Sequence, residues 1–198
     1  MSGKLILASA SIRRRSMFSM LGLSYEVLSP DVDESVKDGT LPEDAVKIIS
    51  RRKVASLNAD PDDFAISADT VVALDGEIFG KPRDKDDALR MLRALSGRDH
   101  SVYTGFSIRH GNKIYTESVL TKVTFRALSE REINIYIDLC NPFDKAGAYG
   151  IQEFAGVFSE KIEGDINNVI GLPLCALEVA MRREFSSSLF DFISSDKV

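Results

Sequence analysis

The sequence predicts a protein of the α/β class, in which strands and helices alternate along one chain. The run Lys4–Ala8 is short and apolar, as a buried strand is, and the polar loop Ser9–Arg15 leads from it into an apolar-periodic stretch. Phe64–Leu74 is again typical of a buried strand, and Asp84–Leu95 places its apolar residues on one helical face. A succession of strand, polar loop and helix is typical of an α/β domain.

Length and composition indicate one folded domain. The chain has 198 residues, of which 44% are hydrophobic and 28% charged. A domain of this size buries roughly 70% of its unfolded surface and needs no disulfide or structural metal to fold. We therefore predict a single α/β domain over residues 1–185, followed by a Ser-rich tail, 186–198, to which we assign no function.

Charge and hydropathy exclude several classes of protein. The net charge of −5, from 30 acidic and 25 basic residues, argues against long nucleic acid as a partner. No apolar run approaches the roughly 20 residues that span a bilayer, and Lys4–Ala8 is too short for a signal peptide. Cys140 and Cys175 form neither a disulfide framework nor a CxxC site, and we expect buried, inert thiols. We expect a cytoplasmic protein without membrane contact.

The elements of the N-terminal half follow from turn and capping signals. After the first strand, the helical stretch Met17–Leu23 closes at a glycine, and Tyr25–Leu28 reads as a second strand. Thr40–Glu43 has the pattern of a capping box with Pro in the first turn, which predicts a helix over about 41–57. Asp75-Gly76 predicts a tight hairpin after the strand at Phe64–Leu74.

The C-terminal half alternates in the same way. Ser96-Gly97 ends the helix that begins at Asp84, and Ser129 to Glu132 predicts a second capping box. The remaining expected segments are antiparallel strands over His100–His110 and Lys113–Ala127, polar Gly-rich stretches over Asp144–Gln152 and Glu163–Pro173, and a last helix over Leu172–Arg183.

The loop Ser9–Arg15 is the first candidate for chemistry. Between a strand and a helix start, free backbone N–H groups and the helix dipole favour an anion. Two hydroxyls and three guanidiniums add donors suited to phosphate oxygens. The alternative is a helix cap by Ser11 with a solvated basic turn, and the glycines of a P-loop or a dinucleotide fingerprint are absent.

Asp69 is the second candidate, because it interrupts a buried strand, where a carboxylate needs a partner, a metal or an open strand end. Thr70 beside it either binds a ligand or is an ordinary strand residue. Asp31, Asp33 and Glu34 form an acidic loop that suits a hard divalent cation, although acidic surface loops are common. Taken singly, Lys53 and Lys81 are more often solvated surface residues.

Other chemistries find no support in the sequence. His100 and His110 have no partner at ligand spacing, which argues against a zinc site. The chain contains no G-x-S-x-G elbow and no credible Cys–His pair, which argues against acyl transfer.

Eight segments occur together in an order that resembles a known family. They are Ser9–Arg14, Asp33–Glu34, Ile66–Val72, Gly80–Pro82, Ser96–Arg98, His100 with Thr104–Gly105, Asp144–Gln152 and Asn168–Pro173. The set resembles the Maf family of nucleoside triphosphate pyrophosphatases, once named for septum-formation inhibition, and covers about residues 4–183. Ile12 departs from the family's usual proline, which changes loop stiffness but removes no charged donor.

The resemblance implies a fold and a reaction. Family members have a mixed, strongly bent sheet flanked by helices, in two lobes around a central cleft. They hydrolyse a nucleoside triphosphate to the monophosphate and pyrophosphate with a divalent metal, which implies Mg²⁺, Mn²⁺ or Co²⁺ here. The family base aligns with Asp69, and we expect Lys53 and Lys81 to neutralise phosphate charge as further catalytic residues.

The resemblance also implies the ligand contacts. We expect the metal at Glu34 and Asp69, and the substrate at Ser9, Ser11, Arg13, Arg14, Thr70 and Gln152. Thr70 and Gln152 resemble the branch of the family that acts on dTTP and UTP rather than on 7-methyl-GTP. A glutamine amide matches the carbonyl, N–H, carbonyl edge of uracil and thymine. The alternative is that Gln152 only braces its loop.

Two other functions remain open at the level of sequence. One is a house-cleaning pyrophosphatase for modified nucleotides such as ITP, XTP or 7-methyl-GTP, with the same fold and mechanism. The other is a non-enzymatic regulator of cell division or septum formation that acts through a partner. The family resemblance also implies a homodimer, although the sequence shows no distinct interface stripe.

Overall fold

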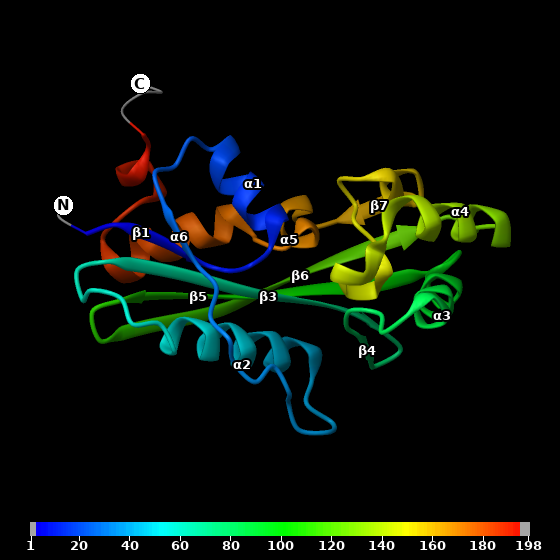
Figure 1. The fold of residues 1–198 in the computed structure, drawn as a ribbon, viewed down its shortest axis with the longest axis horizontal. Coiled ribbons are helices and arrows are strands. Elements are labelled where there is room, and N and C mark those ends of the chain that lie inside the picture. The colour runs from blue at the N-terminus through cyan, green and yellow to red at the C-terminus, as the bar shows by residue number, and fades with distance from the viewer. Residues whose placement is uncertain (1–2, 195–198) are drawn as a thin grey trace. The chain divides into compact units, whose positions relative to one another are not determined.

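The computed structural model describes residues 3–194 and contains a mixed, seven-stranded sheet (Figure 1). The strands follow the order β2-β1-β3-β5-β6-β7, and β4 pairs with β3. β1 runs parallel to β2 and β3, whereas the β3–β4 and β6–β7 pairs are antiparallel. The strand bounds are β1 Leu5–Ala8, β2 Glu26–Leu28, β3 Phe64–Leu74, β4 Glu77–Phe79, β5 Asp99–His110, β6 Lys113–Phe125 and β7 Ser159–Glu163.

Helices flank this sheet, which confirms the predicted α/β class. Their bounds are α1 Ile12–Met20, α2 Pro42–Ala55, α3 Lys85–Leu95, α4 Glu130–Cys140, α5 Ile166–Ile170 and α6 Leu174–Phe185. Short 3₁₀ turns lie at Pro142–Asp144, Ala146–Ala148, Phe154–Val157 and Leu189–Phe192. Within residues 3–194, no helix is both long enough and apolar enough to cross a membrane.

The chain divides into two compact units, in agreement with the two lobes that the resemblance implies. The first unit is Met1–Asp69, Thr104–Val119 and Gly171–Val198, and the second is Thr70–Tyr103 and Leu120–Ile170. The cleft and the bend of the sheet stay predictions, as does the single-domain assignment of residues 1–185. Part of the predicted tail belongs to the first unit, where Leu189 and Phe192 are buried, and residues 195–198 lie outside the described part of the chain.

In the first unit, α2 packs directly against the sheet. A Cβ atom at Gly105 on β5 would lie 2.5 Å from the Val46 carbonyl carbon on α2, so only glycine allows this approach. Two buried hydroxyls complete the contact, because Ser67 Oγ donates to the Ser50 carbonyl over 2.6 Å and Ser107 Oγ donates to Ser50 Oγ over 3.1 Å. These contacts fix the position of α2 and therefore of the residues in its last turn.

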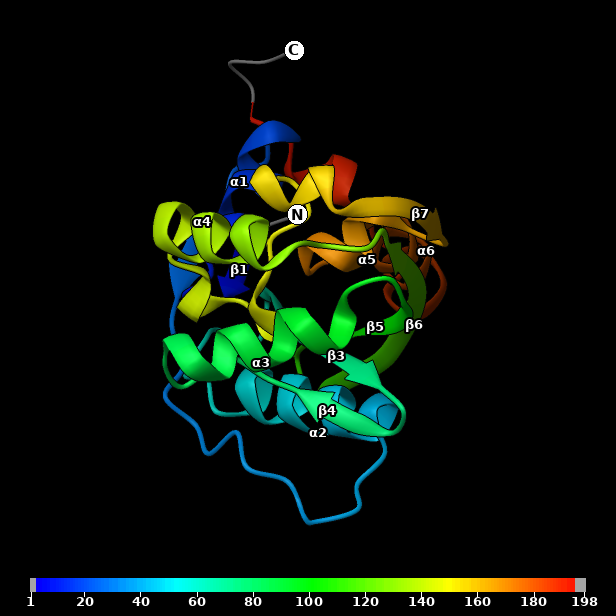
Figure 2. The same cartoon turned by 90° about the vertical axis from the view of Figure 1, so that its right-hand side faces the viewer.

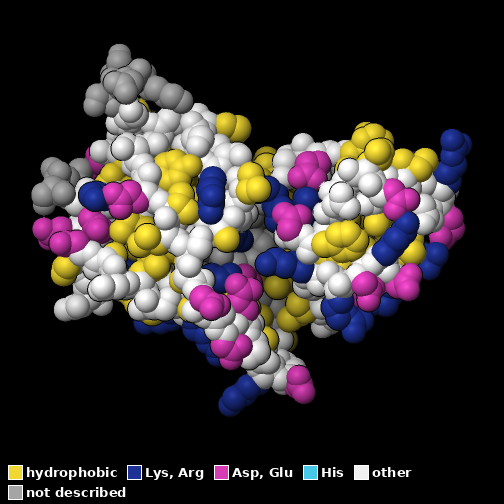
Figure 3. Space-filling view, viewed as in Figure 1, with side chains coloured by type: hydrophobic (Ala, Val, Ile, Leu, Met, Phe, Trp, Pro, Cys, Tyr) yellow, Lys and Arg dark blue, Asp and Glu magenta, His cyan; other side chains and the backbone are white. Residues whose placement is uncertain are grey.

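The second unit has its own apolar core beneath α3 and α4, which lie alongside each other (Figure 2). Leu92 and Leu95 of α3, Tyr136 of α4 and the rings of Phe125 and Phe158 are all buried there. On its surface, acidic and basic side chains are interspersed (Figure 3). Two of the exposed ion pairs in this unit are Arg93–Glu130 and Lys85–Asp138. The amphipathic pattern of Asp84–Leu95 correctly predicted which face of α3 is buried.

Several local predictions are confirmed. Asp75 and Gly76 both have positive φ, as a tight hairpin turn between β3 and β4 requires. Ser129 and Glu132 form the predicted capping box at the start of α4. The helix predicted over Asp84–Leu95 is α3, and Asp84 caps it by accepting from the Asp87 backbone N–H.

Other local predictions are wrong. The expected capping box at Thr40 is absent, because α2 begins after Leu41 without a side-chain cap and the Thr40 hydroxyl donates to the Lys37 carbonyl instead. The stretch expected to be irregular contains α5, and β7 precedes it. Cys175 is exposed and Cys140 only partly buried, because both lie on outward-facing parts of their helices.

Candidate active site

The first unit gathers most of the predicted site residues where β1 ends beside β3. Ala8 pairs with Ser67, so Asp69 lies just beyond the part of β3 that pairs with β1, while Ser9 begins the loop after β1. Because the two strands are parallel and in this register, Ser9 and Asp69 follow neighbouring paired residues and lie close together. The structure thus brings Ser9 and Asp69 together, as the family resemblance implies.

The Ser9 hydroxyl accepts two hydrogen bonds from its own loop and from α1. Its Oγ accepts from the Ser11 backbone N–H and from Arg14 Nη1, each over 3.2 Å, and the residue is 6% exposed. A hydroxyl has two lone pairs and one hydrogen, so these two bonds use its acceptor capacity. Ser9 can therefore meet a ligand only as a donor, which suits a phosphate oxygen.

Ser11 and Arg14 are both held by hydrogen bonds within the protein. Ser11 is the N-cap of α1 and accepts from the Arg14 backbone N–H, as the structural alternative for this loop proposed. The Arg14 guanidinium is buried and Nε donates to the Gly171 carbonyl over 2.7 Å, so this arginine is not solvated. Burial lowers the pKa of Arg14 to about 10, and the negative charges of Asp69 and Glu34 oppose that change. Arg14 thus stays charged at neutral pH and supplies positive potential beneath the loop.

Lys53 joins the two predicted metal ligands. It lies in the last turn of α2, and its Nζ is 2.7 Å from Asp69 Oδ1 and 2.8 Å from Glu34 Oε1. The Lys53 and Asp69 side chains are only 11% and 13% exposed, whereas that of Glu34 is 50% exposed. The alternative of a solvated Lys53 is therefore wrong.

Arg52 holds the acidic loop and was missed by the sequence reasoning. Its Nη1 donates to the carbonyls of Asp33 and Ser35, over 3.0 and 2.6 Å, on either side of Glu34. The Asp33 carboxylate accepts from Ser35 instead of facing the cluster, and Asp31 is exposed. Of the three acidic residues in this loop, Glu34 is therefore the one directed to Lys53. No pattern in the sequence distinguishes Arg52 from a surface arginine.

Arg13 and Thr70 flank this cluster in the chain. Arg13 is the second residue of α1 and half-buried, and Thr70 follows Asp69 on β3 and is also half-buried. Among the described residues, no group of three His, Cys, Asp or Glu side chains could hold a metal by itself. A cation here would therefore need ligands from the substrate or water in addition to Glu34 and Asp69.

Lys81 and Gln152 belong to the second unit, on two loops that are hydrogen-bonded to each other. The Gly147 N–H donates to the Gly80 carbonyl, next to Lys81, over 3.0 Å. Gly147 has a φ of 65° and faces Val72 so closely that a Cβ atom would lie 2.7 Å from the valine side chain. Lys81 and Gln152 are both exposed.

The loop that carries Gln152 is also tied to β5. His100 Nε2 and the Tyr149 hydroxyl share a buried hydrogen bond of 2.8 Å. Burial lowers the pKa of His100 to about 4, so the ring is neutral at pH 7. His100 therefore helps to hold the loop that carries Gln152.

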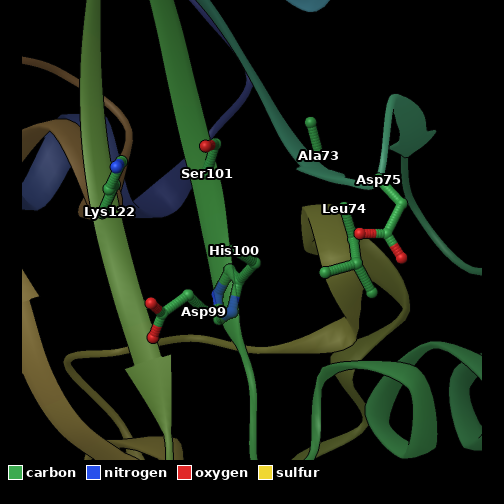
Figure 4. Close-up of a pocket in the computed structure, with 7 residues that line it drawn as sticks. All are labelled: Ala73, Leu74, Asp75, Asp99, His100, Ser101 and Lys122. Atoms are coloured by element: carbon green, nitrogen blue, oxygen red, sulfur yellow. The ribbon is translucent and has the colours of Figure 1, made fainter.

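A separate pocket of about 130 Å³ lies in the second unit (Figure 4). Residues of β3, β5 and β6 line it, and none of them belongs to the predicted site: Ala73, Leu74, Asp75, Asp99, His100, Ser101 and Lys122. Asp99 accepts from the Thr124 hydroxyl and Asp75 from Arg98, so both carboxylates already have partners within the unit. This pocket is not the candidate active site.

The chain is similar to known proteins over most of its length. The model of a family described as Maf-like protein matches residues 4–184. A dTTP/UTP pyrophosphatase of Geotalea uraniireducens is 46% identical over 90% of this chain and 94% of its own length. A dTTP/UTP pyrophosphatase of Chromobacterium violaceum is 48% identical over 86% and 89%.

A solved structure of a nucleoside-triphosphatase, a dITP/XTP pyrophosphatase from Mycobacterium abscessus, shows a weak likeness to this chain. The two are 16% identical with a TM-score of 0.40, over 63% of this chain and 75% of the other. A likeness of that degree supports no conclusion about fold or activity.

Proposed function

Because the chain belongs to the family of Maf-like proteins, we propose that it hydrolyses dTTP and UTP to the monophosphate and pyrophosphate. Relatives that are 46% and 48% identical over most of the chain carry the name dTTP/UTP pyrophosphatase. The sequence led to the same substrates through Thr70 and Gln152. The protein is accordingly a hydrolase that acts on the α–β phosphoanhydride bond.

The Asp69–Lys53–Glu34 cluster is the observation that carries this proposal. A largely buried lysine between two carboxylates contributes little to stability, because desolvation of the charges offsets their attraction. The cluster lies beside Ser9 and the buried Arg14, which supply a donor and a positive charge. Phosphoryl transfer depends mainly on such positioning and electrostatics.

Asp69 accepts the proton in the proposed reaction. Water attacks the α-phosphorus, its oxygen forms the new P–O bond, and the bond from the α-phosphorus to the bridging oxygen breaks. Pyrophosphate leaves with the electron pair of that bond, and the proton of the attacking water passes to the Asp69 carboxylate. Lys53 holds that carboxylate in place through its contact with Oδ1.

The residues present fit a hard divalent cation. Glu34 and Asp69 offer carboxylate oxygens, and Lys53 contacts one oxygen of each. Mg²⁺ and Mn²⁺ commonly bind through one or two carboxylates together with substrate phosphates and water. When bound, such an ion polarises the α-phosphate.

The remaining predicted residues would hold the substrate. We expect Ser9, Arg13 and Lys81 to bind phosphate oxygens, and Thr70 and Gln152 to select the base. A glutamine amide offers donors and an acceptor to the edge of uracil or thymine, whereas cytosine leaves at least one partner unpaired. The preference for a pyrimidine over a purine follows the same reasoning.

We expect the enzyme to act on free nucleotides in the cytoplasm. The net charge of −5 argues against long nucleic acid as a substrate. The homodimer implied by the family stays a prediction, which sedimentation of the purified chain would test.

Pyrophosphate release from a panel of nucleotides tests the proposal. The panel contains dTTP, UTP, CTP, GTP, ITP and 7-methyl-GTP, each with Mg²⁺, Mn²⁺ or Co²⁺. We expect the highest kcat/KM on dTTP and UTP. A higher kcat/KM on ITP or 7-methyl-GTP would favour the house-cleaning alternative, and no release from any nucleotide would favour a regulatory protein.

A further inference from the structure

The segment around Gln152 is a tight turn whose two ends are bonded. The Glu153 N–H donates to the Gly150 carbonyl over 3.0 Å, which closes a four-residue turn. Ile151, at the second position, is 7% exposed in the apolar core of the second unit, while Gln152 at the third position is exposed. The turn therefore directs one side chain inward and presents the other.

The Lys145 side chain contacts both ends of this turn. Its side chain is only 7% exposed, and Nζ lies 3.3 Å from Glu153 Oε2 and 2.8 Å from Asp144 Oδ1. Its methylene chain passes over Gly150, where an added Cβ atom would lie 2.9 Å from Lys145 Cε. Lys145 thus touches the first and last residues of the turn that presents Gln152.

Tyr136 supports the turn from below. The Gly150 N–H donates to the buried Tyr136 hydroxyl oxygen over 3.1 Å. Both backbone N–H groups at the ends of the turn, those of Gly150 and Glu153, therefore have a defined acceptor. What distinguishes Lys145 is that it adds an ion pair at the end next to Gln152.

We propose that Lys145 is a positioning residue for base recognition, which fixes the Gly150–Glu153 turn so that Gln152 meets the nucleotide in one orientation. This inference rests on the proposed function, because it assigns the selectivity of that reaction to a side chain beneath Gln152. If the turn were mobile, binding of the nucleotide would have to order the exposed Gln152 amide, and the entropy lost would weaken its selectivity. In a preorganised turn the amide is already ordered before the nucleotide binds.

The variants Lys145→Met and Glu153→Gln remove the ion pair from either side. The matched control is Lys85→Met, which removes the exposed Lys85–Asp138 ion pair on the same unit and does not touch the turn. We expect the ratio of kcat/KM for dTTP over CTP to fall about 10-fold in each of the first two variants and to stay unchanged in the control. The loss should appear mainly in KM for dTTP, since the reacting groups are untouched.

The double variant Lys145→Met/Glu153→Gln separates positioning from general damage. If the two residues act through one ion pair, the double variant should lose no more selectivity than either single variant. Multiplied losses, or equal losses in Lys85→Met, would overturn the proposal. A wild-type dTTP-to-CTP ratio in folded Lys145→Met would overturn it as well.

Amide hydrogen exchange tests, without any nucleotide, whether Lys145 fixes the Gly150–Glu153 turn. We expect faster exchange of the Gly150 and Glu153 amides in Lys145→Met and unchanged exchange in Lys85→Met. Unchanged exchange in both variants would overturn the inference even if the enzyme is active. If the wild-type protein is inactive but exchange is faster in Lys145→Met, the proposed function is contradicted, while the role of Lys145 in fixing the turn is supported.

Discussion

At the scale of single residues, Asp69 is the group on which the proposed reaction depends most. The substitution Asp69→Asn keeps the size of the side chain but removes its charge and its basicity. Because general-base catalysis contributes roughly 10² to 10⁴ in rate, we expect kcat for dTTP to fall by about that factor. Pyrophosphate release at saturating dTTP measures it.

Asp75→Asn is the matched control, since Asp75 is an exposed carboxylate in an ion pair with Arg98 at the turn after β3. It should leave kcat unchanged, and both variants should retain the wild-type circular dichroism spectrum. Near-normal turnover in folded Asp69→Asn would remove Asp69 from the mechanism.

His100 predicts a pH dependence of stability. Burial lowers its pKa from 6.5 to about 4 in the folded state, so the unfolded chain binds the proton more readily. Its contribution is complete above pH 6.5 and is lost as the pH falls towards 4, by up to about 3 kcal/mol. Urea unfolding of wild type and His100→Gln across this range should show a shallower decline in the variant. The same pH dependence in both proteins would show that His100 does not titrate there.

Single residues were predictable from the sequence where their chemistry is unusual for their position. Asp69 stands out because a carboxylate in an apolar strand needs a partner, and the structure supplies Lys53. Arg52 and Lys145 were missed because charged residues in helices and loops are usually solvated. Arg52 contacts the carbonyl of Asp33, which is distant in the chain, and Lys145 contacts Glu153, which the turn brings back towards it.

At the scale of elements, the docking of α2 decides where Lys53 lies. Gly105→Ala would place a Cβ atom 2.5 Å from the backbone of Val46 and force the helix away from β5. We expect a loss of about 1–3 kcal/mol in the free energy of unfolding, together with reduced activity as Lys53 moves from Asp69. Urea denaturation gives the first quantity and pyrophosphate release the second.

Gly80→Ala provides the control for stability, because a Cβ atom at Gly80 would meet nothing within 4 Å. Its unfolding midpoint should match that of the wild type. If Gly105→Ala unfolds at the same urea concentration as Gly80→Ala, the close approach of α2 to β5 is not required.

Elements were predictable wherever local signals and periodicity agree. The α3 face, the Asp75-Gly76 turn and the Ser129 capping box each follow from a few neighbouring residues. β7 was missed because its residues alternate weakly and its pairing with β6 is a long-range contact. The prediction of a capping box at Thr40 was wrong because the Thr40 hydroxyl has a local alternative acceptor, the Lys37 carbonyl.

At the scale of the whole molecule, the proposed metal affects catalysis but not folding. The site uses only two carboxylates, and each unit has an apolar core of its own. We expect EDTA to abolish pyrophosphate release and to leave the melting temperature unchanged, with activity restored by Mg²⁺ or Mn²⁺. A melting temperature that collapses with EDTA would mean that the metal is structural.

The path of the chain has a consequence for how the protein is made. The first unit takes residues from both ends of the sequence and from its middle, including β1 and α6, while the second unit is interrupted by Thr104–Val119. No continuous fragment contains one complete unit and nothing else. During synthesis, α6 therefore joins β1 in the first unit only after all residues of the second unit have been made. Contacts of such long sequence separation slow folding, and the bridge between Leu23 and Ile193 is one of them.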